Sequence, residues 1–187
     1  MHITPPQLAK SILNLIASVL CKDPVMYIDD RWLYDQEDYL PTIKEIDLKN
    51  QNPKISIKGK DITIVGSGHS SFLAREAAKI LKKENIYTEV IDIRVLNPLK
   101  TSLIKKSVMK TKNLLVVDSG WTSGGFSAEI ITKLVEELPA NCLKNSPVRI
   151  ALPDAPAPTS KLLEKNYYTS TDDLVRATKK ILKKLKR

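Results

Sequence analysis

The chain has 187 residues, of which 42% are hydrophobic and 27% are charged, a composition typical of a globular protein with one domain and an appendage. No apolar run approaches the roughly 18 residues of a membrane helix, and the N-terminus lacks the plan of a signal peptide, so we expect neither a membrane partner nor secretion. The net charge of +9 comes from lysines in helical stretches, which indicates solvated helix faces. Only 5% of the residues are aromatic, so we expect no nucleic-acid partner. A basic tail that binds an acidic protein partner stays open as an alternative.

The first expected element is a helix over residues 8–20, where apolar residues recur at helical spacing. The run Thr4-Pro5-Pro6 suits the entry of this helix, with the threonine as a candidate cap. A short buried strand is expected at 25–28. From 29 to 59 the chain is polar and without a period, and about thirty residues are long for an internal loop of a compact domain. We therefore expect a linker and a domain boundary there.

Strands and helices alternate regularly after this linker, so we divide the chain into 1–59 and 60–187. The expected strands are 61–66, 87–93, 113–118 and 147–151, and the expected helices are 70–84, 99–109, 124–137 and 171–185. The alternation predicts a mostly parallel sheet. Because the strands are continuous apolar runs, both faces of the sheet should be covered by helices, which gives a three-layer α/β fold.

Two glycine turns follow strands in this part, and each opens a helix. Gly66-Ser67-Gly68 has the plan of a dinucleotide fingerprint, with Asp92 at the end of the next strand where a ribose-binding acid would lie. Ser71 stands in place of the third glycine, so the alternative is a tight turn that requires a positive φ. Gly124-Gly125 gives a generic anion-binding geometry, or else allows a helix to pack closely beneath the sheet edge.

Two charged side chains near the carboxyl edge of the sheet are candidates for a substrate cleft. His69, at the first turn, is either a proton-transfer group or a capping or surface residue. Arg94 follows the second strand of this part, where arginine can clamp a phosphate or a carboxylate. The alternative for Arg94 is a loop-fixing salt bridge with Asp92 or Asp118.

Most other motifs of catalytic and metal sites are absent from the sequence. The two cysteines, Cys21 and Cys142, lie far apart without metal-ligand spacing, which indicates a reduced, cytoplasmic protein. The sequence contains no Ser-His-Asp spacing and no HExxH, CxxC or Walker motif. We therefore assign no catalytic residue and no cofactor-binding residue.

Several runs in the same order resemble one enzyme family. They are Asp61–Gly68, Val90–Leu99, Leu115–Asp118 and Gly124–Ile130. Residues 60–137 look like the C-terminal domain of transketolase-like, thiamine-diphosphate-dependent enzymes, above all the beta subunit of the first component of pyruvate or branched-chain 2-oxo acid dehydrogenase complexes. Residues 11–34 resemble the tail of that family's pyrimidine-binding domain, and 153–159 resemble its proline-rich loop. Lys100, Asp118 and Ser127 depart from the usual residues.

The resemblance implies a fragment or split subunit that builds a subunit interface and supports the cleft. Thiamine diphosphate and magnesium belong to the complete enzyme, and the motifs that hold and activate the cofactor are absent from this sequence. The chain alone should therefore be inactive and should not bind the cofactor. Implied partners are a second copy, paired through the C-terminal domain, an alpha subunit or the missing N-terminal half, and an acyltransferase core.

The resemblance also implies a potassium site in some relatives, held by backbone oxygens near the end of the first helix. The matching positions here are Ser18, Cys21 and Asp23, and two of the usual polar residues have changed. Two other functions stay open. A protein-interaction or assembly module without catalysis would use the basic helix 172–187 as its docking surface, and a dinucleotide-binding α/β domain would use the first glycine turn.

Overall fold

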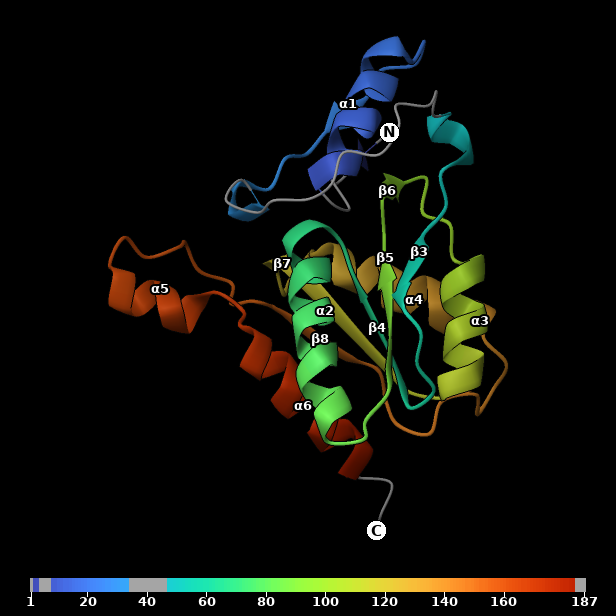
Figure 1. Ribbon diagram of the computed structural model, residues 1–187, viewed down its shortest axis with the longest axis vertical. Coiled ribbons are helices and arrows are strands. Elements are labelled where there is room, and N and C mark those ends of the chain that lie inside the picture. The colour runs from blue at the N-terminus through green and yellow to red at the C-terminus, as the bar shows by residue number, and fades with distance from the viewer. Residues whose placement is uncertain (1, 4–7, 34–46, 184–187) are drawn as a thin grey trace.

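The computed structural model describes residues 2–3, 8–33 and 47–183, and its main body is a five-stranded sheet (Figure 1). The strands, in their order across the sheet, are β3 Lys54–Ile57, β5 Thr88–Asp92, β4 Ile62–Gly66, β7 Leu114–Trp121 and β8 Val148–Leu152. Four of them are parallel, and β3 pairs antiparallel with β5 at one edge. The mostly parallel sheet expected from the sequence is confirmed.

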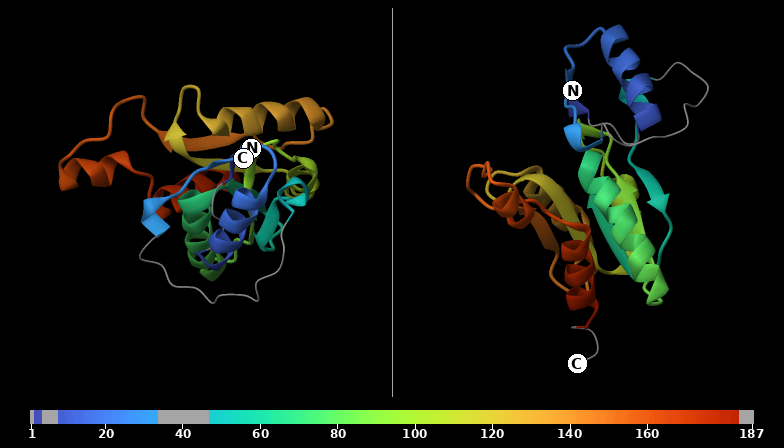
Figure 2. Two further views of the ribbon diagram at one scale, coloured as in Figure 1. Left: turned by 90° about the horizontal axis from the view of Figure 1, so that it is seen from above. Right: turned by 60° about the vertical axis from the view of Figure 1, so that its left-hand side comes forward.

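Helices cover both faces of this sheet (Figures 1 and 2). They are α2 Gly68–Lys83 and α6 Thr171–Lys183 on one face, and α3 Ser102–Thr111 and α4 Phe126–Glu137 on the other. Alternate strand residues serve opposite faces: Ile64 packs with α2 and α6, whereas its neighbour Val65 packs with α3 and α4. Both faces are therefore apolar, and the three-layer fold is confirmed.

The N-terminal segment forms a small unit above the carboxyl edge of the main sheet (Figure 1). It contains α1 Leu8–Leu20 and a three-stranded sheet made of β2 Met26–Tyr27, β1 His2–Ile3 and β6 Val95–Asn97. Ala17 of α1 and Val95 of β6 share a small apolar cluster, which joins this unit to the main body. The expected helix at 8–20 is confirmed, and the expected cap at Thr4 lies outside the described residues.

Several elements differ from the expectation. β1 was not expected, and β2 is not the buried strand expected at 25–28, since Met26 is 58% exposed. β3 lies within the expected linker, because Ile55 and Ile57 alternate with polar residues and pack against the two apolar clusters of the main sheet. β6 and the short helix α5 (Lys161–Tyr167) were also missed. Residues 34–46 of the linker lie outside the described part, and the division at residue 59 stays a prediction. Among the described residues, no helix has both the length and the apolar character needed to cross a membrane.

A buried ion pair lies between β5 and α3. The Glu89 side chain is only 2% exposed; it pairs with Lys110 and accepts the Gly59 backbone N–H at 3.3 Å. Burial alone would raise the pKa of Glu89, but hydrogen bonds from Lys110, Ser107 and Gly59, together with the lysine charge, lower that pKa below its ordinary value. The folded state therefore favours the ionised carboxylate.

We expect Lys110→Met to lower the free energy of unfolding by about 1–2 kcal/mol near neutral pH, because the buried carboxylate loses its cation. The effect is moderate because solvent partly screens the half-exposed ammonium of Lys110. In the native chain, Glu89 contributes stability that is complete above pH 4.5 and is lost as the pH falls through its lowered folded-state pKa. In the variant, burial should prevail and raise this pKa, so the stability should fall as the pH rises above 4.5.

Urea unfolding between acidic and neutral pH measures both slopes, and Glu89→Gln is the matched control that should show neither. A Lys110→Met variant with the native pH profile would contradict this account of the pair.

Candidate functional site

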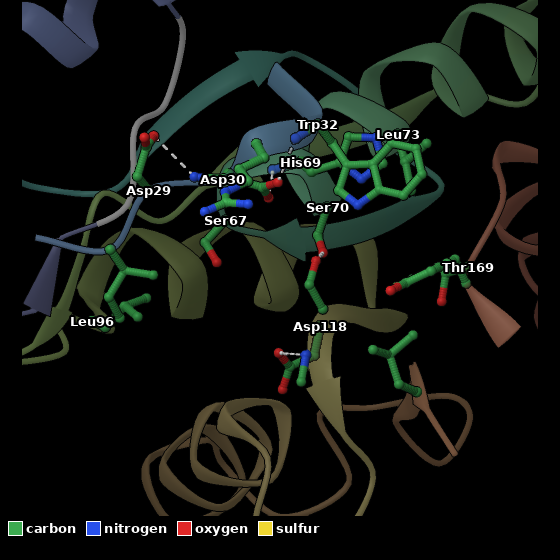
Figure 3. A pocket seen from close by; sticks show the side chains of 17 residues that line it. Asp29, Asp30, Trp32, Ser67, His69, Ser70, Leu73, Leu96, Asp118 and Thr169 are labelled. Carbon is green, nitrogen blue, oxygen red and sulfur yellow. Dashed lines mark hydrogen bonds between the residues drawn. The ribbon is translucent and has the colours of Figure 1, made fainter. Parts of the chain in front are cut away.

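A pocket of about 530 Å³ opens at the carboxyl edge of the parallel strands, beneath the N-terminal segment (Figure 3). Its walls come from residues 28–32, from the turn after β4 at 67–70, and from the end of β7 at 118–120. Tyr168 and Thr169, which lie between α5 and α6, also line it, together with Leu73, Leu96 and Leu152. Ligands of open α/β sheets collect at this edge, and the pocket is therefore the candidate functional site.

The N-terminus of α2 is capped by a carboxylate from the N-terminal segment. The backbone N–H of His69 donates to Asp30 Oδ2 at 3.0 Å, and the preceding Ser67 makes no side-chain cap. Gly68 has a φ of +52°, and a Cβ at Gly66 would lie only 3.0 Å from the backbone of the first helical turn. The first glycine turn is thus a tight turn whose anion is Asp30, and this occupancy argues against a dinucleotide phosphate there.

The N-terminus of α4 is capped in the same way by Asp118. Its Oδ2 accepts the Ser127 backbone N–H at 2.7 Å, and its Oδ1 accepts the Gly120 N–H at 2.9 Å. Gly124 has a φ of +68°, and a Cβ at Gly125 would lie 2.0 Å from the Trp121 carbonyl oxygen. The second glycine turn therefore has an anion-binding geometry, and an internal carboxylate already fills it.

His69 lies in the pocket wall between two aromatic rings. Its ring stacks on Trp32 with the centroids 5.6 Å apart, and on Phe72 at 6.0 Å. Trp32 also meets the edge of Tyr168 at 5.5 Å. Burial lowers the pKa of His69 below its ordinary value, and the nearby Asp30 opposes this effect. The imidazole is accordingly neutral near pH 7, and its stack joins the N-terminal segment to α2.

Arg94 is not among the residues that line this pocket. It lies between β5 and β6, half-buried, and its Nη1 donates to Gln51 Oε1 at 3.2 Å. Burial lowers the pKa of Arg94, while the charge of Asp92 raises it. Its Nε is buried without a hydrogen-bond partner among the described residues. The structure thus brings His69 to the candidate site but places Arg94 outside the pocket wall.

The positions expected for potassium lie at the C-terminal end of α1. Ser18 Oγ donates to the Asn14 carbonyl oxygen at 2.7 Å, and the Ser18 carbonyl oxygen accepts the Cys21 N–H at 3.4 Å. Asp23 is exposed nearby. In the described ranges, no group of three or more His, Cys, Asp or Glu side chains is placed to hold a metal ion. The potassium site stays a prediction.

Sequence reasoning did not identify several residues of the pocket, among them Asp30, Trp32, Ser119 and Tyr168. Ser119 Oγ lies 2.9 Å from Ser70 Oγ and so joins β7 to the start of α2. The one available signal was a tryptophan beside two aspartates in a segment otherwise interpreted as linker. Their convergence depends on packing between segments far apart in the sequence, which no local pattern contains.

The donor set of the pocket does not fit the diphosphate and magnesium end of thiamine diphosphate. Its ionisable side chains are Asp29, Asp30, Arg31, His69, Asp118 and Tyr168, of which three are carboxylic acids. A diphosphate requires several cationic side chains or free helix N-termini, whereas this lining has Arg31 as its one lysine or arginine, and both helix N-termini are already capped by carboxylates. The described residues can therefore form one wall of a larger site, and no catalytic step is derived through this cofactor.

Comparisons with known proteins agree on one family. The model of the "Transketolase, C-terminal domain" family matches residues 53–174. The "Pyruvate dehydrogenase E1 component subunit beta, mitochondrial" of Rattus norvegicus is 33% identical over 186 residues, which cover 97% of this chain and 52% of the relative. The protein of the same name from Pisum sativum is 33% identical over 185 residues, which cover 96% of this chain and 51% of the relative. The chain thus spans about half the length of the curated relatives it matches.

Solved structures share the fold. A split gene transketolase, described as an inactive beta4 tetramer, matches with a TM-score of 0.78 and 25% identity, over 97% of this chain and 57% of that one. A transketolase mutant from Pichia stipitis matches with a TM-score of 0.64 and 13% identity, over 99% of this chain and 25% of that one. The second likeness shows the fold alone.

The lowered pKa of His69 predicts a pH dependence of stability. Protonation favours the unfolded chain, where the histidine pKa is about 6.5, so the free energy of unfolding should fall as the pH is lowered from 6.5 through the folded-state pKa. His69→Gln keeps a polar side chain without this titration and should remove that slope. Urea unfolding at pH 7.5 and pH 5.5 makes the comparison, and an equal slope in both proteins would assign the dependence to other groups.

Proposed function

The chain belongs to the transketolase C-terminal domain family, and from this premise we propose that it forms the C-terminal part of the beta subunit of a thiamine-diphosphate-dependent enzyme. The reaction class that we propose for the whole assembly is that of a pyruvate or branched-chain 2-oxo acid dehydrogenase, or of a transketolase. The observation that carries the proposal is the 33% identity that extends over 97% of the chain but only 52% of the rat relative.

The role of this chain in that assembly is positional. α1 exposes the apolar side chains Leu15, Ile16, Val19 and Leu20, and the last two are 77% and 70% exposed. A contiguous apolar helix face open to water is typical of a protein interface. We propose that the half of the subunit corresponding to the remaining length of the relatives covers this face and closes the pocket from above. Catalytic groups, the diphosphate site and magnesium would then come from that half and from an alpha subunit.

The proposed partners follow from the same premise. We propose that two copies pair through the domain after Lys60, as closed two-fold pairs are the commonest soluble assemblies. The tetramer described for the split gene transketolase supports self-association, and its inactivity supports a chain that is inactive alone. An acyltransferase core is a further proposed partner. The free thiols Cys21 and Cys142 support a reducing, cytoplasmic compartment, although the curated relatives named above are mitochondrial.

The contacts described above also bear on the two alternative functions. A dinucleotide-binding domain needs a free helix N-terminus at its glycine turn, and Asp30 occupies that of α2. An assembly module without catalysis shares the exposed face of α1 with the main proposal. Reconstitution of activity with the complementing half and the alpha subunit separates the two, because a module of that kind would restore no turnover.

We predict that the chain alone does not bind thiamine diphosphate, because its pocket supplies neither the diphosphate nor the magnesium ligands. Calorimetric titration with the cofactor and Mg²⁺ measures this. The same titration on the chain co-purified with the complementing half and the alpha subunit is the positive control and should give saturable binding. A micromolar affinity of the chain alone would refute the division of roles.

We also propose that Arg94 serves the substrate cleft of the complete assembly, because its buried Nε lacks a partner in the described part of the chain. Arg94→Ala should lower kcat/KM of the reconstituted enzyme about tenfold, equivalent to roughly 1.4 kcal/mol of transition-state binding. Gln51→Ala is the matched control, since it removes the same Arg94–Gln51 hydrogen bond but keeps the guanidinium. Equal losses of activity in both variants, in proportion to their losses of stability, would make Arg94 a structural residue.

A further inference from the structure

Seven lysines lie at the amino edge of the main sheet, in the loops before its strands and near the ends of its helices, at the opposite end from the pocket. This basic rim consists of Lys60, Lys82, Lys83, Lys112, Lys144, Lys180 and Lys183. All of them are exposed except Lys112, which is half-buried. Among the described residues, none of the seven forms an ion pair. The acids at this edge are Glu84, which pairs with Lys179 at 2.6 Å, Asp61, which accepts the Tyr87 N–H at 2.7 Å, and Glu89, which pairs with Lys110 and accepts the Gly59 N–H at 3.3 Å.

The fold explains why positive charge collects at this edge, but it does not explain the amount of that charge. The helices α2, α3 and α6 run antiparallel to the strands and end at this edge (Figure 1), and lysines near helix C-termini are favoured by the helix dipole. Each helix end carries roughly half a negative elementary charge, so three ends offset about one and a half charges. The remaining lysine charge of the rim is uncompensated by this fold.

The backbone beneath the rim is held in one arrangement. Asn113 Nδ2 donates to the Asp61 carbonyl oxygen at 2.9 Å, which fixes the loop before β4. Asn145 Nδ2 donates to Asn113 Oδ1 at 2.9 Å and to the Ile181 carbonyl oxygen at 3.2 Å, which fixes the loop before β8 against the end of α6. The Lys144 N–H donates to the Lys112 carbonyl oxygen at 2.9 Å. The lysines therefore project from a rigid, shared base.

We propose that the basic rim is a docking surface for an acidic, unstructured protein segment rich in aspartate and glutamate. All seven cations are lysines, which act as mobile point charges without the bidentate geometry that arginine gives to phosphate recognition. The one aromatic ring at this edge, Tyr87, has Lys60 Nζ above it at 5.2 Å, so no open platform for base stacking is present in the described part. Charge complementarity without an apolar anchor suits a flexible acidic chain, bound quickly and weakly.

This surface goes beyond the proposed function, and it lies at the opposite edge of the main sheet from the pocket. A segment docked there would tether another protein to the assembly without obstructing the carboxyl edge. Because the attraction is electrostatic, binding should weaken steeply as the salt concentration rises.

Fluorescence anisotropy with the full chain and a labelled peptide of alternating glutamate and serine tests the proposal. The triple variant Lys82→Glu, Lys144→Glu, Lys180→Glu should weaken peptide binding at least about tenfold. The matched control changes Lys54, Lys161 and Lys165 to glutamate. These three lysines are exposed and lie off the rim, and the control alters the net charge equally, so its affinity should stay within about twofold of the native value. Urea unfolding confirms that both variants fold.

Equal weakening in both triple variants would overturn the proposal, because the net charge alone would then explain binding. So would tighter binding of an oligothymidylate of the same net charge as the peptide, which would indicate a nucleic-acid surface. Tighter binding to vesicles containing phosphatidylserine would indicate a membrane surface, and the absence of saturable peptide binding would remove the docking surface altogether.

Discussion

Asp118 accepts two backbone N–H groups, from Gly120 at 2.9 Å and from Ser127 at 2.7 Å, and so ties the end of β7 to the start of α4. Asp30 does the same for α2 from a segment far away in the sequence. Each helix N-terminus would otherwise leave unpaired N–H groups and a partial positive charge at the crowded sheet edge. These two carboxylates therefore determine how the carboxyl edge is built, and they leave less room for an external anion.

The direction of the helix dipoles affects the charge at both edges of the sheet. The N-termini of α2 and α4 lie at the carboxyl edge of the strands, where Asp30 and Asp118 accept their backbone N–H groups, and the C-termini of α2, α3 and α6 lie at the amino edge, together with the lysines of the basic rim. The two ends differ in one respect. The carboxylates at the carboxyl edge are already hydrogen-bonded within the chain, whereas the lysines at the amino edge carry more positive charge than the helix ends offset. The helix N-termini at the carboxyl edge are therefore already occupied, whereas the amino edge keeps positive charge that can attract an acidic partner.

The sequence predicted the regular elements of the main body well, because their apolar runs are long and continuous. It failed at β3, where Ile55 and Ile57 supply only two inward positions on an edge strand. At the site, the sequence left the first glycine turn open between a dinucleotide fingerprint and a tight turn, and the second between an anion-binding geometry and close packing of a helix. Which anion occupies them is decided by contacts between distant segments, and neither Asp30 nor Asp118 carries a local signal of that role. The stack of Trp32 on His69 was missed for the same reason.

The pocket and α1 are best understood together. The pocket has aromatic and hydroxyl groups in its wall and acids that are already hydrogen-bonded, so it has the character of a supporting surface more than of a reacting one. On α1, Val19 and Leu20 present apolar area to water, which is unfavourable unless another chain covers it. Under the function proposed above, this pocket and the uncovered face of α1 would together form one side of a cleft that the complementing half completes. The contribution of this chain would then be to position that half through α1 and the Asp30–His69 contact.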